Sequence, residues 1–332
     1  MNNPANPDNI LWFDKGEPSE RVEQIGLEHP RVAHGAADMI PTPSYPEATQ
    51  DTPGRDFWEE MTDVARCVEL ARSKAPFASG SGEDHPALGP RSNSMSPLSK
   101  FLQSRGLLKP YDLGMAVADD PPWYWPTKLF DYLLAKHGPP QGLLPDVGYK
   151  RFLTGPVLAH TIMSGAFLHA GFTTFALKKY FARPRPEEVA HEVAAGRMTP
   201  PDWAMRLLEA SMDFDAVAAD ARTFTLLPDR GSPTHGAYGQ GHGTNFGGTG
   251  LCLKFFWPMA AADIDRTMWG LSRGRDYLGV HYASDADAGL HVGETLAVDY
   301  VLAELARLSG ESVDLDALRA RLEPVRTNWL TT

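Results

Sequence analysis

Residues 157–177 read VLAHTIMSGAFLHAGFTTFAL, a mostly apolar run that has nearly the length of a transmembrane helix. Two histidines and four Ser or Thr residues interrupt the run, and the mean hydropathy of the whole chain is −0.31. These features favour a long helix over 157–180, buried at the centre of a folded domain, over a helix in lipid. We therefore expect a helical core and no membrane association.

Segments with helical composition lie on both sides of this run. They cover 56–74, 96–106, a segment that begins at Pro126, and 187–195, 201–211, 243–256, 261–274, 282–308 and 314–322. The chain shows neither a regular alternation of strands and helices nor an internal repeat. It therefore predicts an all-α fold of antiparallel helical bundles over residues 56–332.

Residues 1–55 show no sustained hydrophobic period. Two interpretations remain for them, namely an extended N-terminal arm wrapped over the core or over a neighbouring subunit, and a disordered tail. We take the extended arm as the prediction.

Composition excludes several classes of protein. With 332 residues, of which 42% are hydrophobic, the chain can bury a sizeable core. Its net charge of −11 argues against a nucleic-acid-binding protein, because phosphate backbones require a basic face. The two cysteines, Cys67 and Cys252, can build neither a disulfide framework nor a cysteine zinc site. Residues 1–20 lack the basic start and apolar segment of a signal peptide, which predicts a cytoplasmic location.

A glycine-rich stretch, GAYGQGHGTNFGGTG, occupies residues 236–250. A dinucleotide-binding loop is disfavoured, because Thr244 stands where the third glycine of GxGxxG belongs and no alternation of strands and helices surrounds it. The alternative is an anion cradle, in which small residues let backbone N–H groups at a helix N-terminus approach a ligand. Such a cradle requires basic side chains from elsewhere in the chain.

Basic side chains are concentrated in KKYFARPRPEE, residues 178–188. Arg183 and Arg185 each precede a proline, which keeps them out of the α region, so we expect the chain to leave the helix here. Arg185 can then fold back towards Lys178. The competing interpretation is a solvated basic patch at a helix C-terminus, where Lys and Arg are favoured.

The stretch SRGRDYLGVHYASDADAG, residues 272–289, contains a histidine and a carboxylate whose spacing allows them to form a hydrogen bond. Arg275 and His281 flank a turn at Gly279, and Asp285 follows His281 by four residues, on the same face of a helix. Asp285 can accept the N–H of the imidazole and leave the other ring nitrogen as a nucleophile or ligand. A purely structural His–Asp pair is the alternative.

Together the three stretches resemble the signature of the superfamily of type-2 phosphatidic-acid phosphatases and vanadium haloperoxidases. The matching positions are Lys178, Arg185-Pro186, Gly241-His242, Arg275, His281 and Asp285, all within residues 178–285. The chain looks most like the vanadium bromoperoxidases of algae and their bacterial relatives, because His235, seven residues before His242, belongs to the pattern of that branch.

The resemblance implies an all-α fold of the vanadium haloperoxidase type and vanadate as the cofactor. It implies that His281 binds vanadium directly, and that Lys178, Arg185, Arg275 and the N–H of Gly241 hold the vanadate oxygens. Several fixed cations suit the charge of an oxyanion of this kind. The family often assembles into oligomers, and with the proline-rich arm this predicts a homo-oligomer.

The resemblance also assigns the catalytic groups of a peroxidase that uses hydrogen peroxide, a halide ion and a small organic acceptor. His242 is the acid–base group, Lys178 polarises the peroxide, His235 favours bromide, and Asp285 orients the metal-binding histidine. The chain departs from the family at Gln240, where serine is usual. The glutamine amide can still donate a hydrogen bond to an oxyanion, so we keep Gln240 among the cofactor-binding residues.

Two other functions remain open at this point. A phosphatase that acts on a phosphomonoester or a diphosphate would use His281 as nucleophile and His242 as leaving-group acid, with phosphate or nothing in place of vanadate. A family member with altered or lost chemistry is the other alternative, because of Gln240.

Overall fold

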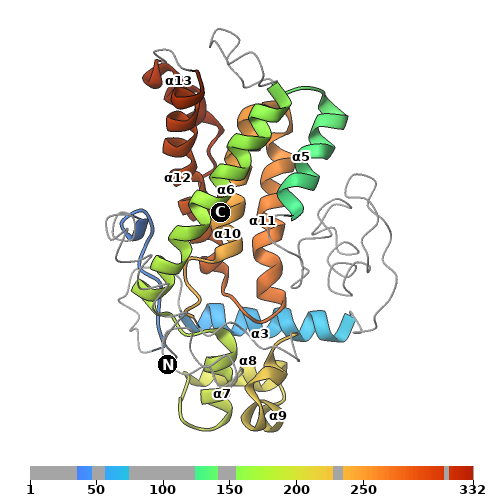
Figure 1. Ribbon diagram of the computed structural model, residues 1–332. Helices are drawn as coiled ribbons and strands as arrows, with labels where there is room; N and C mark the ends of the chain where they lie inside the picture. The colour runs from blue at the N-terminus through green and yellow to red at the C-terminus, as the bar shows by residue number, and fades with distance from the viewer. Residues whose placement is uncertain are drawn as a thin grey trace, which may run out of the picture.

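The computed structural model describes residues 36–46, 57–74, 124–140, 155–226, 235–309 and 314–331 (Figure 1). Its α-helices are α3 (Phe57–Lys74), α5 (Tyr124–His137), α6 (Gly155–Phe181), α7 (Pro186–Ala194), α8 (Asp202–Ser211), α9 (Phe214–Ala219), α10 (Gly241–Phe256), α11 (Ala261–Tyr277), α12 (Ala283–Ser309) and α13 (Leu315–Leu322). Short 3₁₀ turns are η3 (Ala221–Phe224), η4 (Pro258–Ala260), η5 (Glu323–Val325) and η6 (Trp329–Thr331). The described residues contain no strand, which confirms the predicted all-α fold.

The predicted helices correspond closely to the observed ones within the described ranges. The main differences are α10, which begins at Gly241 instead of 243, and α11, which continues to Tyr277. Helix α9 was not predicted, because six residues are too few to show a helical period; the carboxylate of Asp213 caps it by accepting a hydrogen bond from the N–H of Ala216. The helix expected over 96–106 lies outside the described residues.

Helices α6, α10, α11 and α12 stand upright and side by side in Figure 1. Gly241 and Gly248 of α10 lie against Thr174 and Ala166 of α6, so these two helices run in opposite directions.

Helix α10 runs parallel to α12 and antiparallel to α11. Its residues Gly243 and Gly247 lie against Ala286 and Leu290 of α12, so α10 and α12 run in the same direction. Helix α11 follows α10 through η4 and runs back along it, antiparallel to both. As a result, the C-terminal ends of α6 and α11 lie at the same end of the bundle as the N-terminal ends of α10 and α12.

The sequence of the linker after α6 explains where this helix ends. Ala182 has φ of 46°, in the left-handed region that commonly terminates helices. Arg185 is extended, with φ of −81° and ψ of 156°, and Pro186 then begins α7 at a position that suits proline. The predicted departure from the helix at the two Arg-Pro pairs is confirmed.

The long apolar helix α6 is buried on one side only. Leu158, Ile162 and Ala166 are fully buried in the main core, whereas Leu168 is 57% exposed and Tyr180 is 56% exposed. The expected burial of this helix is confirmed for one side, whereas its expected central place is wrong, because α6 lies at the edge of the bundle and α10 takes the central place. No helix in the described part of the chain is both long enough and apolar enough to cross a membrane.

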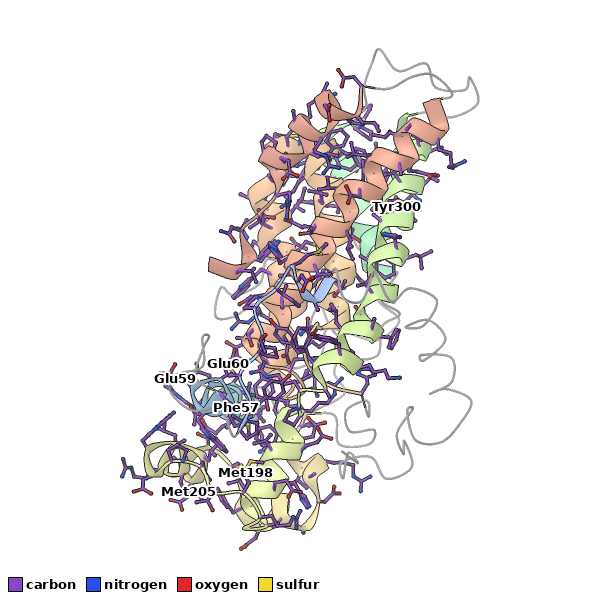
Figure 2. All side chains as sticks on the ribbon, turned by 90° about the vertical axis from the view of Figure 1, so that its left-hand side faces the viewer. Phe57, Glu59, Glu60, Met198, Met205 and Tyr300 are labelled. Atoms are coloured by element: carbon purple, nitrogen blue, oxygen red, sulfur yellow. The ribbon has the colours of Figure 1, made fainter. Side chains whose placement is uncertain are left out.

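A second layer closes the lower end of the bundle in Figure 1. Helix α3 lies across this end, and α7, α8 and α9 lie beneath α3. Figure 2 shows Phe57 and Glu60 of α3 between the bundle and the region of Met198 and Met205. A separate buried apolar cluster holds this layer together, and it includes Tyr282 from the loop before α12.

Part of the expected N-terminal arm is described, over residues 36–46. Its side chains Ala36 and Ile40 are buried against Phe181 and Tyr238. The hydroxyl of Tyr238 donates a hydrogen bond to the carbonyl oxygen of Pro41 (2.6 Å). This short segment thus packs on the core, whereas residues 1–35 and 47–55 lie outside the described residues.

Candidate functional site

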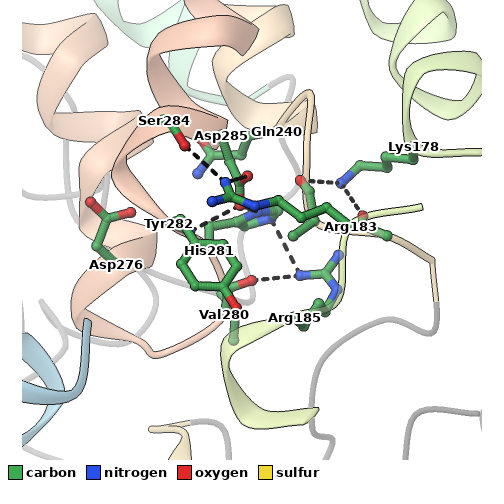
Figure 3. A network of polar contacts seen from close by, with 12 residues as sticks. Lys178, Arg183, Arg185, Gln240, Asp276, Val280, His281, Tyr282, Ser284 and Asp285 are labelled. Atoms are coloured by element: carbon green, nitrogen blue, oxygen red, sulfur yellow. Dashed lines mark hydrogen bonds and ion pairs between the residues drawn. The ribbon is translucent and has the colours of Figure 1, made fainter. Parts of the chain in front are cut away.

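The helix directions bring the residues of the three motifs to one end of the bundle (Figure 3). Lys178 lies in the last turn of α6, Gly241 begins α10, Arg275 lies in the last turn of α11, and His281 comes two residues before α12. Arg185, in the linker between α6 and α7, points back towards the same place and completes the group.

Lys178 and Arg185 are buried cations held by neutral acceptors. The ammonium of Lys178 donates to the carbonyl oxygens of Gly236 (3.0 Å) and Ala237 (3.2 Å). Arg185 donates from Nε to the carbonyl oxygen of His235 (2.9 Å) and from Nη1 to that of Val280 (2.8 Å). Within the described ranges, no carboxylate accepts a hydrogen bond from either side chain. The predicted return of Arg185 towards the end of α6 is confirmed, and neither cation belongs to a solvated patch.

His281 is oriented by Asp285, as its spacing predicted. Its Nδ1 lies 3.1 Å from Asp285 Oδ2, and Asp285 is fully buried. Because an ionised carboxylate only accepts hydrogen bonds, Nδ1 carries the proton and donates it. The other ring nitrogen, Nε2, lies 3.4 Å from Nη1 of Arg185, a group that only donates. His281 therefore presents the lone pair of Nε2 among the cations.

His235 and His242 each accept a hydrogen bond from an arginine. Nη2 of Arg185 lies 3.0 Å from Nδ1 of His235, and Nη2 of Arg275 contacts Nε2 of His242. Since a guanidinium can only donate, Nε2 of His242 offers a lone pair and this imidazole is neutral. Nδ1 of His235 also lies 3.3 Å from the carbonyl oxygen of Gly236, and it accepts from Arg185 in the tautomer that carries its proton on Nε2. Both rings remain partly accessible to solvent.

The electrostatics of the cluster agree with these contacts. Burial, together with the neighbouring cations, holds the pKa values of His235, His242 and His281 well below their ordinary value. Burial and the charge of Arg185 lower the pKa of Lys178 in the same way. Burial also lowers the pKa of Arg185, although nearby carboxylates oppose this shift. Burial is the larger cause of these shifts, and the neighbouring cations add to it at the three histidines and Lys178; a bound anion would offset the contribution of the cations.

Asp285 offsets only part of this positive charge, because its carboxylate is shared with another cation. Its Oδ1 lies 2.8 Å from Nη1 of Arg183, a third buried arginine, and Arg183 also contacts Glu60 (2.6 Å). The three side chains carry one positive and two negative charges, so they form a buried ion group with an excess of negative charge beside the cationic cluster.

The first turn of α10 adds backbone donors to the cluster. The first N–H groups of an α-helix have no partner within the helix, and the side chain of Gln240, the N-cap residue, does not cap them. Gly241 is the first helical residue, and its N–H is one of these donors. The helix has sixteen residues, so its dipole also favours a negative charge at this end.

Gln240 is buried at the same place but serves a helix contact. Its Nε2 donates a hydrogen bond to the carbonyl oxygen of Ser272 on α11 (3.1 Å), and its side chain is fully buried. Its Oε1 has no hydrogen-bond partner among the described residues. Gln240 thus ties α10 to α11, which is a role that the sequence did not suggest.

Most glycines of 236–250 lie inside α10, and they serve helix packing. A Cβ atom on Gly247 would lie 2.2 Å from the carbonyl oxygen of Leu290, and one on Gly250 would lie 2.8 Å from Cγ of Met268. On α12, a Cβ atom on Gly293 would lie 2.1 Å from the carbonyl oxygen of Thr244. The interpretation of the whole stretch as an anion cradle is therefore wrong for these glycines, because close contact with the backbone of α12 requires Gly247 and close contact with the Met268 side chain requires Gly250.

Two residues of the buried polar network were missed as functional candidates. Arg183 was noted only as one of four basic residues, and Glu60 lies far from every motif in the sequence. The Arg183–Pro184 pair was a signal for a special backbone, but nothing in the sequence pointed to its partner on α3.

The chain matches no protein-family model, and no curated protein matches it. The fold and the site define an all-α protein that has a buried group of cations and neutral histidines at one end of a helical bundle.

The neutral histidines predict that acid destabilises the protein. Their folded-state pKa values are depressed, so below a pH of about 6.5 the unfolded chain binds more protons than the folded one. Stability should then fall with decreasing pH by about 1.4 kcal/mol per pH unit for each such histidine. Urea unfolding between pH 7 and 5 measures how the free energy of unfolding changes with pH. His242→Gln should reduce this slope by the contribution of one histidine, about 1.4 kcal/mol per pH unit. Equal slopes in the parent and His242→Gln would contradict the assignment.

Proposed function

We propose that the protein is a vanadium-dependent haloperoxidase, which oxidises a halide ion, preferably bromide, with hydrogen peroxide at a vanadate held by His281. The observation that supports this most is the lone pair of His281 Nε2 beside the buried cations Lys178 and Arg185, which no described carboxylate neutralises by hydrogen bonding. Such a group of donors suits an oxyanion that also accepts one nitrogen ligand.

The residues present fit vanadate. His281 Nε2 would bind vanadium, while Arg185, Arg275 and the N–H of Gly241 would hold its oxygens. An ammonium has three N–H donors, and the described residues accept from two of those of Lys178, which leaves one for the anion. When bound, vanadate would supply a Lewis acid that activates hydrogen peroxide for oxygen transfer to the halide.

His242 would take the proton that hydrogen peroxide gives up. Its Nε2 now accepts from Arg275, but an oxyanion is a stronger acceptor for a guanidinium than a neutral imidazole is. Anion binding would thus release the Nε2 lone pair of His242 for the proton. Overall, hydrogen peroxide, a halide ion and one proton give hypohalous acid and water, and the proton on His242 can return to the departing water.

Lys178 and Asp285 would act without changing their own protonation. Lys178 would place its remaining N–H on a peroxide oxygen and stabilise the negative charge that develops there. Asp285 would keep the Nδ1 proton of His281 in place, so that Nε2 stays available. His235 lies beside Arg185 with its ring nearly perpendicular to that of Phe175, and its partial exposure fits a position along the path of the halide.

A phosphohydrolase is the second candidate, because the same lone pair could attack phosphorus. Nε2 of His281 would form a P–N bond while the P–O bond to the leaving group breaks, and the leaving oxygen would take a proton from His242; water would then cleave the P–N bond. This role requires a protonated His242, whereas its contact with Arg275 and its lowered pKa favour the neutral form. The neutral form suits the base of the peroxidase better.

The two candidates separate in one pair of assays on the purified protein. We expect bromination of a dye that depends on hydrogen peroxide, bromide and added orthovanadate together. Hydrolysis of p-nitrophenyl phosphate is measured in parallel, with and without orthovanadate.

Each pattern of results selects one function. Hydrolysis without vanadate and no bromination with it would reject the haloperoxidase in favour of the phosphohydrolase. Neither activity would favour a protein with altered chemistry at Gln240. As a control, His242→Ala should reduce the bromination rate by about 10²–10⁴-fold, the usual contribution of a proton-transfer group.

A further inference from the structure

Arg183 lies beside the candidate site and makes several hydrogen bonds and ring contacts there. It is fully buried, and its guanidinium lies 4.1 Å from the centre of the Tyr282 ring. It donates hydrogen bonds to Ser44 O (3.1 Å), Ser284 Oγ (2.8 Å), Asp285 Oδ1 (2.8 Å) and Glu60 Oε2 (2.6 Å). These contacts fix the guanidinium from several sides.

Glu60 connects this arginine to the start of α12. The Glu60 side chain is 2% exposed, and its Oε1 accepts from the backbone N–H of Ser284 (2.9 Å). Its Oε2 accepts from the hydroxyl of Ser284 (2.8 Å) as well as from Arg183. Glu60 therefore holds the guanidinium and also the residue that precedes Asp285.

Both oxygens of Asp285 are used as a result. Oδ1 accepts from Arg183, while Oδ2 accepts from the backbone N–H of Tyr282 (2.9 Å) and from Nδ1 of His281. A buried carboxylate with both oxygens bonded cannot turn in its site. Without Arg183, Oδ1 would be buried without this partner, and the Asp285 carboxylate would be free to rotate away from His281.

We propose that Arg183, held by Glu60, is a positioning residue for His281. By fixing Asp285, Arg183 keeps the proton of His281 on Nδ1 and keeps the lone pair of Nε2 directed at the anion. The proposal makes α3, which carries none of the sequence motifs, a part of the site. It rests on the proposed function only for the identity of the anion.

A pair of matched variants tests the proposal. Glu60→Gln removes the charge that holds Arg183 and keeps the shape of the side chain. Glu294→Gln is the control, because Glu294 is 1% exposed and accepts from the buried Lys254 and from the backbone N–H of Thr327 (2.8 Å), in a network that includes no residue of the site. Urea unfolding of both variants measures the general cost of losing a buried carboxylate.

The decisive measurement is the tautomer of His281, read from the ring nitrogen signals of protein labelled with ¹⁵N-histidine and assigned with His281→Gln. The parent and Glu294→Gln should show one form with the proton on Nδ1. Glu60→Gln should show a mixture of tautomers, and it should bind orthovanadate about 10-fold more weakly while its binding of inorganic phosphate stays nearly unchanged. Arg183→Met should bind orthovanadate about 100-fold more weakly, which is within the range for removing a residue that orients a ligand.

The affinity of Arg183→Lys for orthovanadate should lie between those of the parent and Arg183→Met, because lysine keeps the charge but lacks the planar fork. If Arg183→Met does not fold, Arg183→Lys replaces it in the test. Unchanged tautomer and affinity in folded Glu60→Gln, or the same losses in Glu294→Gln, would overturn the proposal. A parent that binds neither anion would instead reject the proposed function, while the tautomer comparison still decides the role of Arg183.

Discussion

Replacing His281 by alanine should abolish the binding of orthovanadate and leave the binding of inorganic phosphate nearly intact. His281 is the residue that offers a ring nitrogen to the anion in a fixed orientation, whereas Lys178 and Arg185 attract any tetrahedral oxyanion. Changes to residues that merely orient a ligand cost about 10–100-fold, so loss of the ligand itself should weaken vanadate binding by at least about 100-fold. Isothermal titration with each anion measures both affinities.

The control for this change is His160→Ala. His160 lies on α6, against Ser164 and Phe130, and has no contact with the cluster. It should bind both anions as the parent does. If His281→Ala binds orthovanadate as tightly as the parent, the assignment of His281 as the vanadium ligand is wrong. If it loses phosphate to the same extent, His281 supports the whole cluster and is not a specific ligand.

The helices could be predicted because their cause is local. The residue types and the prolines of the chain mark α6, α7, α11 and α12 within a few positions. The exit of the chain from α6 followed from Pro184 and Pro186, since each restricts the residue before it. The spacing of His281 and Asp285 likewise predicted their contact, but the reason differs from the one expected: His281 lies two residues before α12, and Asp285 in the first turn of α12 reaches back to it and to the backbone N–H of Tyr282.

The surroundings of the site could not be predicted because they arise from packing over long distances in the chain. Glu60 and Asp285 meet at Arg183 from helices that have no pattern in common. The amide of Gln240 reaches Ser272, thirty-two residues further on, and nothing near either residue signals the contact. The cations can be counted in the sequence, but the packing decides which of them a carboxylate already neutralises.

The glycines of α10 are a second example of packing that could not be predicted from the sequence. Their number was visible in the sequence, and a cost of about 0.5–1 kcal/mol for each glycine within a helix demanded a reason. The reason supplied was a ligand, whereas Gly243 and Gly247 meet the backbone of α12, whose own glycines Gly289 and Gly293 face α10 in turn. A parallel pair of helices in such close contact can be recognised from sequence only when both partners are already known.

This packing leads to the second large effect, which concerns stability. Gly247→Ala would place a methyl group 2.2 Å from the carbonyl oxygen of Leu290, an atom of the backbone of α12 that cannot turn away. The two helices would have to separate along the centre of the bundle, and we expect a loss of about 3 kcal/mol or more, at the upper end for overpacked cores. Gly241→Ala, in the same helix, is the matched control, because its methyl group would meet Cγ2 of Thr174 at 3.4 Å, an ordinary contact. It should cost little in urea unfolding and can even gain from the better helix propensity of alanine. Equal stability of the two variants would show that α10 and α12 do not depend on this contact, and the glycines would again need a ligand to explain them.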